Sequence, residues 1–190
     1  MKESTNTPEH LGGHLNKVHL DLGTLDYLIK RFEPNTFLDI GCGPGWMTRE
    51  AISRGLQGHG IDGDPTLTYE PYMHKLDFTT DEVADLDLLP QYDLGWSVEF
   101  VEHVEGKYIP VFMQAFSKCK AVCMTYSPDP RPPKHVNVQS AEYWINVFKD
   151  YGFILDEEAT KALRTVSTMK KYFMSSTGMV FIKEQSNEEV

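Results

Sequence analysis

The stretch Phe37-Leu38-Asp39-Ile40-Gly41-Cys42-Gly43-Pro44-Gly45-Trp46 decides the fold. An apolar run leads into three alternating glycines, and a helix-like stretch from Met47 to Arg54 follows. Because glycine lacks a Cβ, the chain can turn tightly with positive φ while its N–H groups approach a bound molecule. The stretch therefore predicts a strand, a tight turn and a helix, with a ligand held against the turn.

The glycine spacing is G-x-G-x-G, and the acidic Asp39 lies two positions before the first glycine. It differs from the G-x-G-x-x-G loop that cradles a pyrophosphate. It resembles motif I of the class I S-adenosylmethionine-dependent methyltransferases, although dinucleotide enzymes and plain tight turns also use glycine-rich strand-to-helix turns. The resemblance implies that S-adenosylmethionine contacts Asp39, Gly41, Cys42, Gly43, Gly45 and Trp46.

Length and charge restrict the class of protein. With 190 residues, the chain is about the size of one domain, and we expect a single methyltransferase domain over 1–190. The net charge of -10 argues against a general affinity for nucleic acid or anionic membranes, although a local basic patch remains compatible with it. No apolar run approaches the roughly 20 residues that span a bilayer, and we expect a cytoplasmic protein.

The three cysteines are Cys42, Cys119 and Cys123. Cys119 and Cys123 are four residues apart in an apolar run that reads as a strand, so we expect them to share a face. This spacing favours packing over a disulfide.

Apolar runs alternate with helical stretches from Phe37 onward, which is the pattern of βαβ units and a parallel sheet. We expect strands at 37–40, 57–62, 72–77, 92–98, 120–126, 152–156 and 178–183, and helices near 45–54, 81–88, 109–118, 140–151 and 157–173. Before them, Leu22 to Phe32 forms an amphipathic helix that Asp21 or Thr24 can cap. Gly55 and Gly152 fit positions just past helix ends, Pro110 fits a first helical turn and Ser140 fits an N-cap.

The two ends of the chain carry weaker signals. Residues 1–20 are interpreted as an extension that includes His10, His14 and His19, either a surface loop or short capping helix, or a lid over the substrate. Residues 185–190 are expected to be a disordered tail. The turn 175–178 before an apolar run resembles the start of the antiparallel seventh strand of class I methyltransferases. The resemblance implies an α/β, Rossmann-like, seven-stranded sheet that is mostly parallel.

Ligands of open α/β sheets bind beyond the carboxyl ends of the strands, so the residues that end each strand are informative. Asp62 lies about twenty residues after the glycine turn, where a carboxylate can accept both ribose hydroxyls, and Gly63 lets the adenosine lie close. Asp77 can accept the adenine amino group beside Phe78. The alternatives are a turn built from Asp, Gly and Pro at 62–65, and Asp77 as a helix cap. The family resemblance also places Ser97 and Val98, at the end of the fourth strand, in the cofactor site.

The sequence Glu99-Phe100-Val101-Glu102-His103 follows the fourth strand. If the chain leaves the strand in a helical turn, Glu99, Glu102 and His103 stand at i, i+3 and i+4 on one face. Two carboxylates and an imidazole there suit magnesium, manganese or iron better than structural zinc, and His135 on a proline-rich loop can add a fourth ligand.

The E-x-x-E-H pattern followed by a loop histidine resembles the small O-methyltransferases of ubiquinone biosynthesis and the small-RNA terminal-ribose methyltransferases. In those families the matching side chains hold a metal that binds the acceptor's oxygens. The ligands implied here are Glu99, Glu102, His103 and His135. The same motif also occurs in methyltransferases that use no metal, where the histidine packs or caps. The segment around His135 lacks the histidine-rich character of the RNA enzymes.

The expected reaction is methyl transfer from S-adenosylmethionine to a hydroxyl of a small molecule. A metal can lower the acceptor's pKa, and without one His103 or His135 is the candidate general base. An RNA-terminus ribose methyltransferase is the enzyme alternative. A catalytically silent S-adenosylmethionine-binding regulator and an NAD-type oxidoreductase are alternatives of other classes. Nothing in the sequence indicates the oligomeric state.

Overall fold

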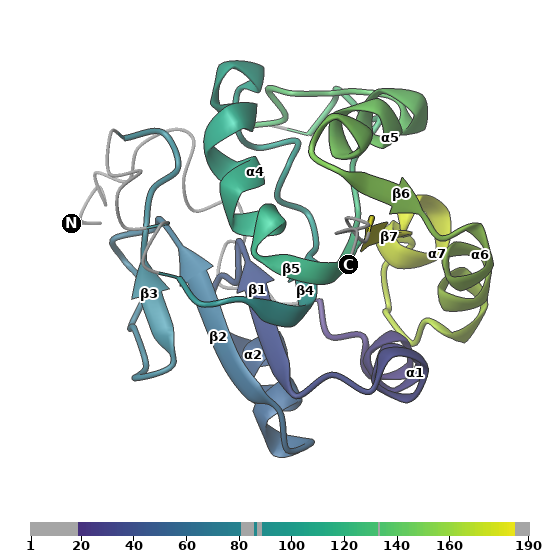
Figure 1. Cartoon of the computed structure of the whole chain (residues 1–190). Helices are drawn as coiled ribbons and strands as arrows, with labels where there is room; N and C mark the ends of the chain where they lie inside the picture. The colour runs from purple at the N-terminus through teal and green to yellow at the C-terminus, as the bar shows by residue number, and fades with distance from the viewer. Residues whose placement is uncertain (1–18, 81–85, 87–88, 133, 185–190) are drawn as a thin grey trace, which may run out of the picture.

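The computed structural model describes residues 19–80, 86, 89–132 and 134–184. Seven strands form one sheet in the order β3-β2-β1-β4-β5-β7-β6 (Figure 1). The strands are β1 Thr36–Ile40, β2 Gln57–Asp62, β3 Met73–Lys75, β4 Tyr92–Ser97, β5 Cys119–Met124, β6 Phe153–Leu155 and β7 Met179–Lys183. The helices are α1 Leu22–Phe32, α2 Trp46–Ser53, the 3₁₀ turn η1 Gly106–Tyr108, α4 Ile109–Ser117, α5 Ala141–Asp150, α6 Glu157–Val166 and α7 Phe173–Thr177.

Strand direction confirms the expected topology. The pairs from β3 through β5 are parallel, whereas β7 runs antiparallel to both β5 and β6. The strands β1, β2, β4 and β5 therefore end at one edge of the sheet, which we call the carboxyl edge, and the opposite edge is the amino edge. Because β7 is reversed, its first residue, Met179, lies beside Met124 at the end of β5. The carboxyl edge thus gathers the glycine turn, the ends of β2, β4 and β5, and the start of β7.

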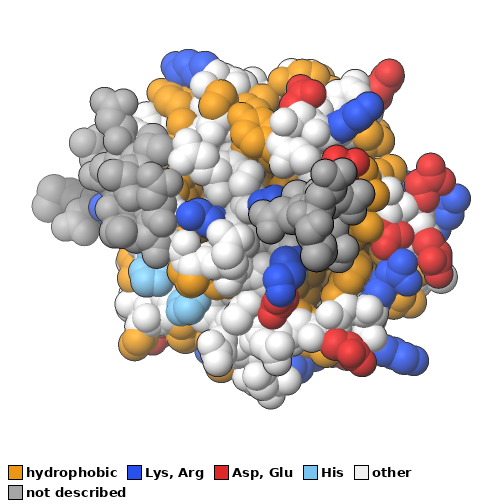
Figure 2. Space-filling model, viewed as in Figure 1, with side chains coloured by type: hydrophobic (Ala, Val, Ile, Leu, Met, Phe, Trp, Pro, Cys, Tyr) orange, Lys and Arg blue, Asp and Glu red, His pale blue; other side chains and the backbone are white. Residues whose placement is uncertain are grey.

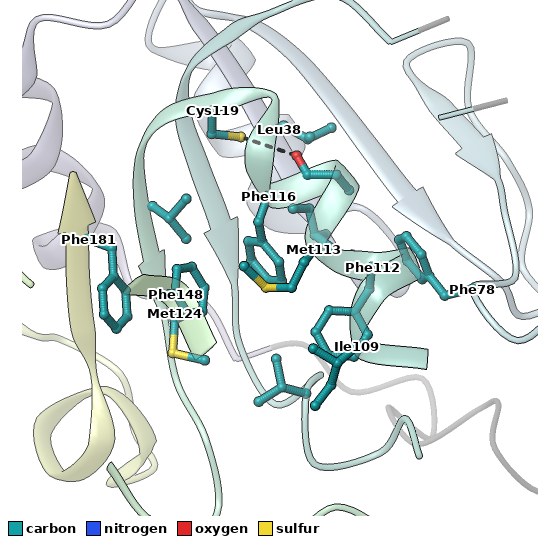
Figure 3. Close-up of a cluster of buried hydrophobic side chains, with 14 of the residues drawn as sticks. Leu38, Phe78, Ile109, Phe112, Met113, Phe116, Cys119, Met124, Phe148 and Phe181 are labelled. Carbon is teal, nitrogen blue, oxygen red and sulfur yellow. Dashed lines mark hydrogen bonds between the residues drawn. The ribbon is translucent and has the colours of Figure 1, made fainter. Parts of the chain in front are cut away.

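Two hydrophobic clusters cover the two faces of the sheet. Figure 1 shows α4 and α5 on one side and α1 and α2 on the other. On the first side, Phe112 and Phe116 of α4 point at the sheet, and the Phe148 ring of α5 stacks on Phe181 with centroids 4.1 Å apart (Figure 3). On the second side, Leu25 of α1 and Leu163 of α6 are among the residues that pack against the sheet. This double cover explains why the central strands read as continuous apolar runs.

Local signals placed the helix ends correctly. Asp21 is the N-cap of α1 and accepts from the Thr24 N–H at 3.0 Å, and Ser140 caps α5 through the Tyr143 N–H. Pro110 lies in the first turn of α4. Gly55 and Gly152 follow helix ends with φ of 90° and 78°, where glycine is strongly favoured.

The predicted helix 157–173 is wrong in its second half. The helix α6 ends at Val166, and a separate five-residue helix, α7, begins at Phe173. The reason is a competing set of hydrogen bonds, because Asp21 accepts from the Ser167 hydroxyl at 2.5 Å and from the Thr168 N–H at 2.8 Å. The other differences are small, since β3 covers only Met73–Lys75 of the predicted strand 72–77.

The three cysteines are free and buried, as expected, but Cys119 and Cys123 do not share a face. The Cys119 thiol lies 3.8 Å from the Ala115 carbonyl oxygen in the cluster under α4 (Figure 3). The Cys123 thiol lies 3.8 Å from the Met174 sulfur in the other cluster. Cys119 is the first residue of β5 and follows α4 after a single residue, so its side chain still packs against that helix.

Some predictions fall outside the described residues. They are the helix 81–88 apart from the buried Leu86, most of the extension 1–20, and the tail 185–190. Among the described residues, no helix has the length and apolarity that a membrane crossing requires.

Candidate functional site

The glycine turn has the backbone conformation that its sequence predicts. Gly41, Gly43 and Gly45 have φ of 75°, 52° and 73°. The turn is fixed to β2, because the N–H groups of Gly41 and Cys42 both donate to the Ile61 carbonyl. A β-carbon at Gly41 would lie 2.5 Å from the Phe100 ring, and one at Gly45 would lie 2.6 Å from the Met73 sulfur. Side chains are therefore excluded from this turn on steric grounds as well as by φ.

Three of the predicted cofactor residues have side chains that hold the turn from within. The buried Asp39 carboxylate accepts from the Thr48 hydroxyl of α2 at 2.9 Å, and burial raises its pKa to about 7. The buried Ser97 hydroxyl donates to the Ile40 carbonyl at 2.9 Å. Cys42 is buried, with its thiol 3.5 Å from the Gly43 carbonyl. These side chains tie β1 to α2 and β4 at the point where the glycine turn begins.

Asp62 joins the glycine turn to the turn after β2. Its carboxylate accepts from the Gly43 N–H at 2.8 Å and from the Asp64 N–H at 2.9 Å. The Tyr69 hydroxyl donates to the carbonyls of Asp62 and Asp64, at 2.7 and 3.0 Å. Both interpretations of Asp62 are therefore compatible with the geometry. It builds the local turn, and its half-buried carboxylate stands beside the glycine turn, where a ribose would need it.

The end of β3 resembles the end of β2, because here too a carboxylate holds the turn that follows the strand. The Asp77 carboxylate accepts from the N–H and hydroxyl of Thr79 at 2.9 and 2.7 Å, so it caps the following turn. The buried Phe78 ring meets the Phe100 ring edge to face, with centroids 5.3 Å apart. Phe100 in turn covers Gly41, so these two aromatic rings connect the end of β3 to the glycine turn.

The remaining predicted cofactor residues lie near this turn. Gly63 is buried and Val98 is half-buried against the cluster under α1 and α2. Trp46, in the first turn of α2, is 42% exposed and lines a cavity of about 290 Å³ together with Arg49 and Tyr72.

The E-x-x-E-H segment brings its side chains together without a helix. Glu99 has the left-handed φ of 55°, and the chain then turns so that the His103 N–H donates to the Phe100 carbonyl. The expected helical turn from Glu99 is therefore not formed. Even so, ligand atoms of Glu102, His103 and His135 all lie within 4.8 Å of one another. Glu99 and Glu102 are close enough that the charge of Glu99 raises the pKa of Glu102.

Both histidines are oriented by backbone carbonyls. His103 Nδ1 lies 3.0 Å from the Lys134 oxygen, and His135 Nδ1 lies 2.7 Å from the Asp129 oxygen. A carbonyl can only accept, so each Nδ1 carries a proton, which leaves Nε2 as the nitrogen of each ring that can bind a metal. The rings stand at 87° with centroids 4.9 Å apart. Fixing the tautomer through Nδ1 is the usual second-layer arrangement for metal-binding imidazoles.

Burial makes the carboxylates unusual. Glu102 is fully buried, and its carboxyl lies against the Glu99 carboxyl and its own backbone N–H. Among the described residues neither of its carboxylate oxygens, nor Glu99 Oε1, has a well-aligned hydrogen-bond partner. Burial raises the pKa of Glu99, and burial followed by the charge of Glu99 raises that of Glu102 well above its usual range. Burial, then His135, lowers the pKa of His103 to about 4. The two acidic side chains lie beside the His103 and His135 rings, and a divalent cation held between them would compensate the buried negative charge.

Some residues that support the candidate site were not predicted from the sequence. The buried Thr125 hydroxyl accepts from the Glu99 N–H at 3.0 Å, and the buried Asn137 N–H donates to the Glu102 carbonyl at 3.0 Å. Tyr69 holds the Asp62 turn, and Phe100 covers Gly41. The predicted strand 120–126 included Thr125, whereas β5 ends at Met124, so its position after the strand emerges only from the structure.

Comparison with known proteins identifies the class. A family model described as a methyltransferase domain matches residues 16–158, and the chain belongs to this family. It is accordingly an enzyme of the methyltransferase class, and its sheet has the strand arrangement of the class I fold. No curated protein matches the sequence.

Several solved structures share the fold at low sequence identity. Magnesium protoporphyrin IX methyltransferase from Synechocystis, bound to S-adenosylhomocysteine, matches with a TM-score of 0.58 and 12% identity, over 84% of this chain and 80% of that chain. A SAM-dependent methyltransferase from Archaeoglobus fulgidus matches with a TM-score of 0.55 and 16% identity, over 85% and 93%. The methyltransferase domain of a bacterial Hen1 matches with a TM-score of 0.56 and 14% identity, over 86% and 97%. At these identities the similarity establishes the fold alone.

Proposed function

We propose that the protein transfers a methyl group from S-adenosylmethionine to a hydroxyl oxygen of a small molecule, and that Glu99, Glu102, His103 and His135 hold a divalent cation that binds this acceptor. The observation that carries the metal is the buried Glu102 carboxylate and Glu99 Oε1, which have no well-aligned donor among the described residues, beside two imidazoles that backbone carbonyls hold through Nδ1. Buried carboxylates that lack a hydrogen-bond partner are costly unless a charge compensates them.

The cofactor half of the proposal rests on the glycine turn and the strand ends. The turn brings backbone close to a ligand at the carboxyl edge, which is where open α/β sheets bind their ligands. Each carboxylate oxygen has two lone pairs, so Asp62 can accept ribose hydroxyls while it keeps the Gly43 and Asp64 N–H groups. The structures with bound S-adenosylhomocysteine and S-adenosylmethionine among the structural neighbours support this choice of cofactor.

The acceptor half of the proposal rests on the protonation state of His103. With a pKa of about 4, the His103 imidazole is neutral at pH 7, which a metal ligand requires and which makes it a weak general base. Two carboxylates with two imidazoles favour manganese or iron, with magnesium also suited to the oxygen ligands. Such an ion, when bound, supplies Lewis acidity that lowers the pKa of an acceptor hydroxyl. The protein aligns that oxygen with the methyl group and excludes water.

The choice between a small molecule and an RNA terminus rests on charge. The net charge is -10, and positive and negative side chains alternate on the face shown in Figure 2. Binding along a phosphate backbone requires clustered lysines and arginines. Hence a small-molecule acceptor is favoured, and the RNA ribose remains the second candidate because its chemistry at the hydroxyl is the same.

The proposal is tested by metal titration and turnover. We expect one Mn²⁺ per chain, detected by calorimetry, and methylation of a hydroxyl compound that stops on chelation and resumes with Mn²⁺. Glu102→Gln keeps the shape of the side chain and removes its charge, so it should fold and should weaken Mn²⁺ binding about 100-fold or more. Glu142→Gln, an exposed change on α5, is the matched control. Full turnover after complete chelation, or unchanged Mn²⁺ affinity in Glu102→Gln, would overturn the metal assignment.

A further inference from the structure

We propose that Lys170, Lys171 and Tyr172, here called the docking loop, bind an acidic group of the acceptor, so that the acceptor is an anionic small molecule. The inference rests on the proposed function, because it assigns a charge to the acceptor of that site. It is carried by the place of the loop in the fold, by its anchoring and by two exposed lysines that pair with no acidic side chain among the described residues.

The docking loop lies at the carboxyl edge. The helices α1 and α6 pack against each other, and contacts at their two ends show that they run in opposite directions. Asp156, before α6, pairs with Arg31 in the last turn of α1 at 2.9 Å, whereas Ser167, after α6, bonds to Asp21 before α1. The end of α1 leads into the start of β1 at the amino edge, so the end of α6 lies at the opposite edge (Figure 1).

A short path connects the docking loop to the candidate metal centre. The loop leads directly into α7, and α7 leads into β7. The first residue of β7, Met179, pairs with Met124 of β5. The next residue of the chain after β5 is Thr125, whose hydroxyl accepts from the Glu99 N–H. The loop and the acidic cluster therefore both belong to the carboxyl edge of the sheet, with α7 and the ends of β7 and β5 between them.

The backbone on both sides of the docking loop is anchored. Asp21, which is fully buried, accepts from the Thr168 N–H at 2.8 Å, and the Gly23 N–H donates to the Thr168 hydroxyl at 3.0 Å. At the other end Tyr172 is the N-cap residue of α7, and its carbonyl accepts from the Ser176 N–H of that helix at 2.8 Å. The Asp21 N–H itself contacts the Met47 sulfur in α2, directly after the glycine turn. A surface held in this way loses little conformational entropy when it binds a ligand.

The side chains of the docking loop are displayed to solvent. Tyr172 is 81% exposed, and both lysines are exposed. Among the described residues, no acidic side chain pairs with Lys170 or Lys171, whereas Lys161 on the preceding helix pairs with Glu157. Lysine ammonium groups bind phosphate and carboxylate as point charges, and a tyrosine ring offers an apolar face to a planar molecule. In a protein with a net charge of -10, this loop is suited to an acidic, partly aromatic acceptor.

The test uses phenyl phosphate, which carries both features and needs neither metal nor turnover. The ¹⁵N-labelled full chain, with S-adenosylhomocysteine present, is titrated and followed by amide chemical shifts. We expect the amides of residues 170–172 to shift with phenyl phosphate and not with phenol. The double variant Lys170→Gln/Lys171→Gln should weaken the binding about fivefold or more, as expected for two exposed charge contacts. The control Lys30→Gln/Lys149→Gln removes two exposed lysines at the amino edge and should leave binding unchanged.

Two outcomes would overturn the proposal. One is a titration in which the amides of 170–172 do not shift, or in which Lys30→Gln/Lys149→Gln weakens phenyl phosphate binding as much as Lys170→Gln/Lys171→Gln does. The other is an oligoribonucleotide that binds the loop more than 100-fold more tightly than phenyl phosphate, which would assign it to RNA. Failure of the proposed function is distinguishable, because the loop would then bind phenyl phosphate although no hydroxyl compound is methylated. Methylation of an anionic acceptor with an unchanged KM in Lys170→Gln/Lys171→Gln would reject the docking loop and retain the proposed function.

Discussion

At the scale of single residues, Glu99 and Lys134 set the geometry of the candidate metal centre. Both are non-glycine residues with positive φ, 55° and 71°; Glu99 begins the E-x-x-E-H segment and Lys134 directly precedes His135. Such conformations cost free energy and persist where the surroundings impose them. At Glu99 one such constraint is the Thr125 hydroxyl, which accepts from its N–H. At Lys134 the carbonyl accepts from His103 Nδ1, so the strained residue also orients a ligand.

We expect Thr125→Val to weaken Mn²⁺ binding about 10- to 100-fold while the chain stays folded. The substitution removes the hydroxyl that accepts from the Glu99 N–H, and with it a contact that supports the left-handed conformation of Glu99. Thr125→Ser keeps the hydroxyl and should bind Mn²⁺ nearly as the parent does. Calorimetric titration of the three proteins checks this. Equal affinity in the valine and parent proteins would show that Thr125 does not position Glu99.

Asp39 provides a pH-dependent test of the glycine turn. Burial raises the pKa of its carboxyl from 3.8 to about 7, so between these values the native state binds more protons than the unfolded state. The contribution of Asp39 to the free energy of unfolding therefore falls as the pH rises from about 4 to about 7, and stays low above that. Asp39→Asn cannot titrate and keeps an acceptor for the Thr48 hydroxyl.

We expect the difference in unfolding free energy between Asp39→Asn and the parent to shift in favour of asparagine across this pH range, by up to a few kcal/mol. Urea unfolding at pH 4.5, 6 and 8 measures it, with the exposed Glu142→Gln as a control that should show no such trend. A difference that stays constant with pH would mean that Asp39 is ionised throughout.

At the scale of elements, the sequence predicted what local interactions decide. The caps Asp21 and Ser140 accept hydrogen bonds from N–H groups three residues ahead, and the glycines after helix ends act through their own φ. Both kinds of helix end can therefore be predicted from a few neighbouring residues. The end of α6 is different. It is set by hydrogen bonds from Ser167 and Thr168 to Asp21, about 146 residues away, and the residues next to Val166 in the sequence do not predict them.

The candidate metal centre also has a part that the sequence predicted and a part that it could not predict. Glu99, Glu102, His103 and His135 could be proposed as a group from their types and order, and the structure brings the last three within 4.8 Å of one another. The means by which they meet could not be predicted, because the left-handed Glu99 depends on Thr125 from the neighbouring strand, and the tautomer of His135 depends on the Asp129 carbonyl. The first contact joins segments that only the folded sheet brings together, and the second depends on how the loop between Asp129 and His135 folds back on itself.

At the scale of the whole molecule, the carboxyl edge concentrates the chemistry. The glycine turn, the Asp62 turn, the acidic cluster and the docking loop come from both halves of the chain, and Asp21 links the docking loop to α2 beside the glycine turn. Because these parts share anchors, a ligand at one of them should stabilise the whole domain against unfolding.

This coupling gives a prediction that separates the methyltransferase from an NAD-type oxidoreductase of similar topology. S-adenosylhomocysteine at about 100 times its Kd should add about 2.7 kcal/mol to the free energy of unfolding, a rise in Tm of about 5–10 °C for a chain of this size. NADH at the same concentration should produce no rise. Asp62→Ala should abolish the response to S-adenosylhomocysteine, since it removes both the ribose acceptor and the bond to the Gly43 N–H, whereas Asp150→Ala, an exposed change on α5, should preserve it. A Tm that rises with NADH and not with S-adenosylhomocysteine would mean that the glycine turn holds a dinucleotide, and the acidic cluster would then need a different explanation.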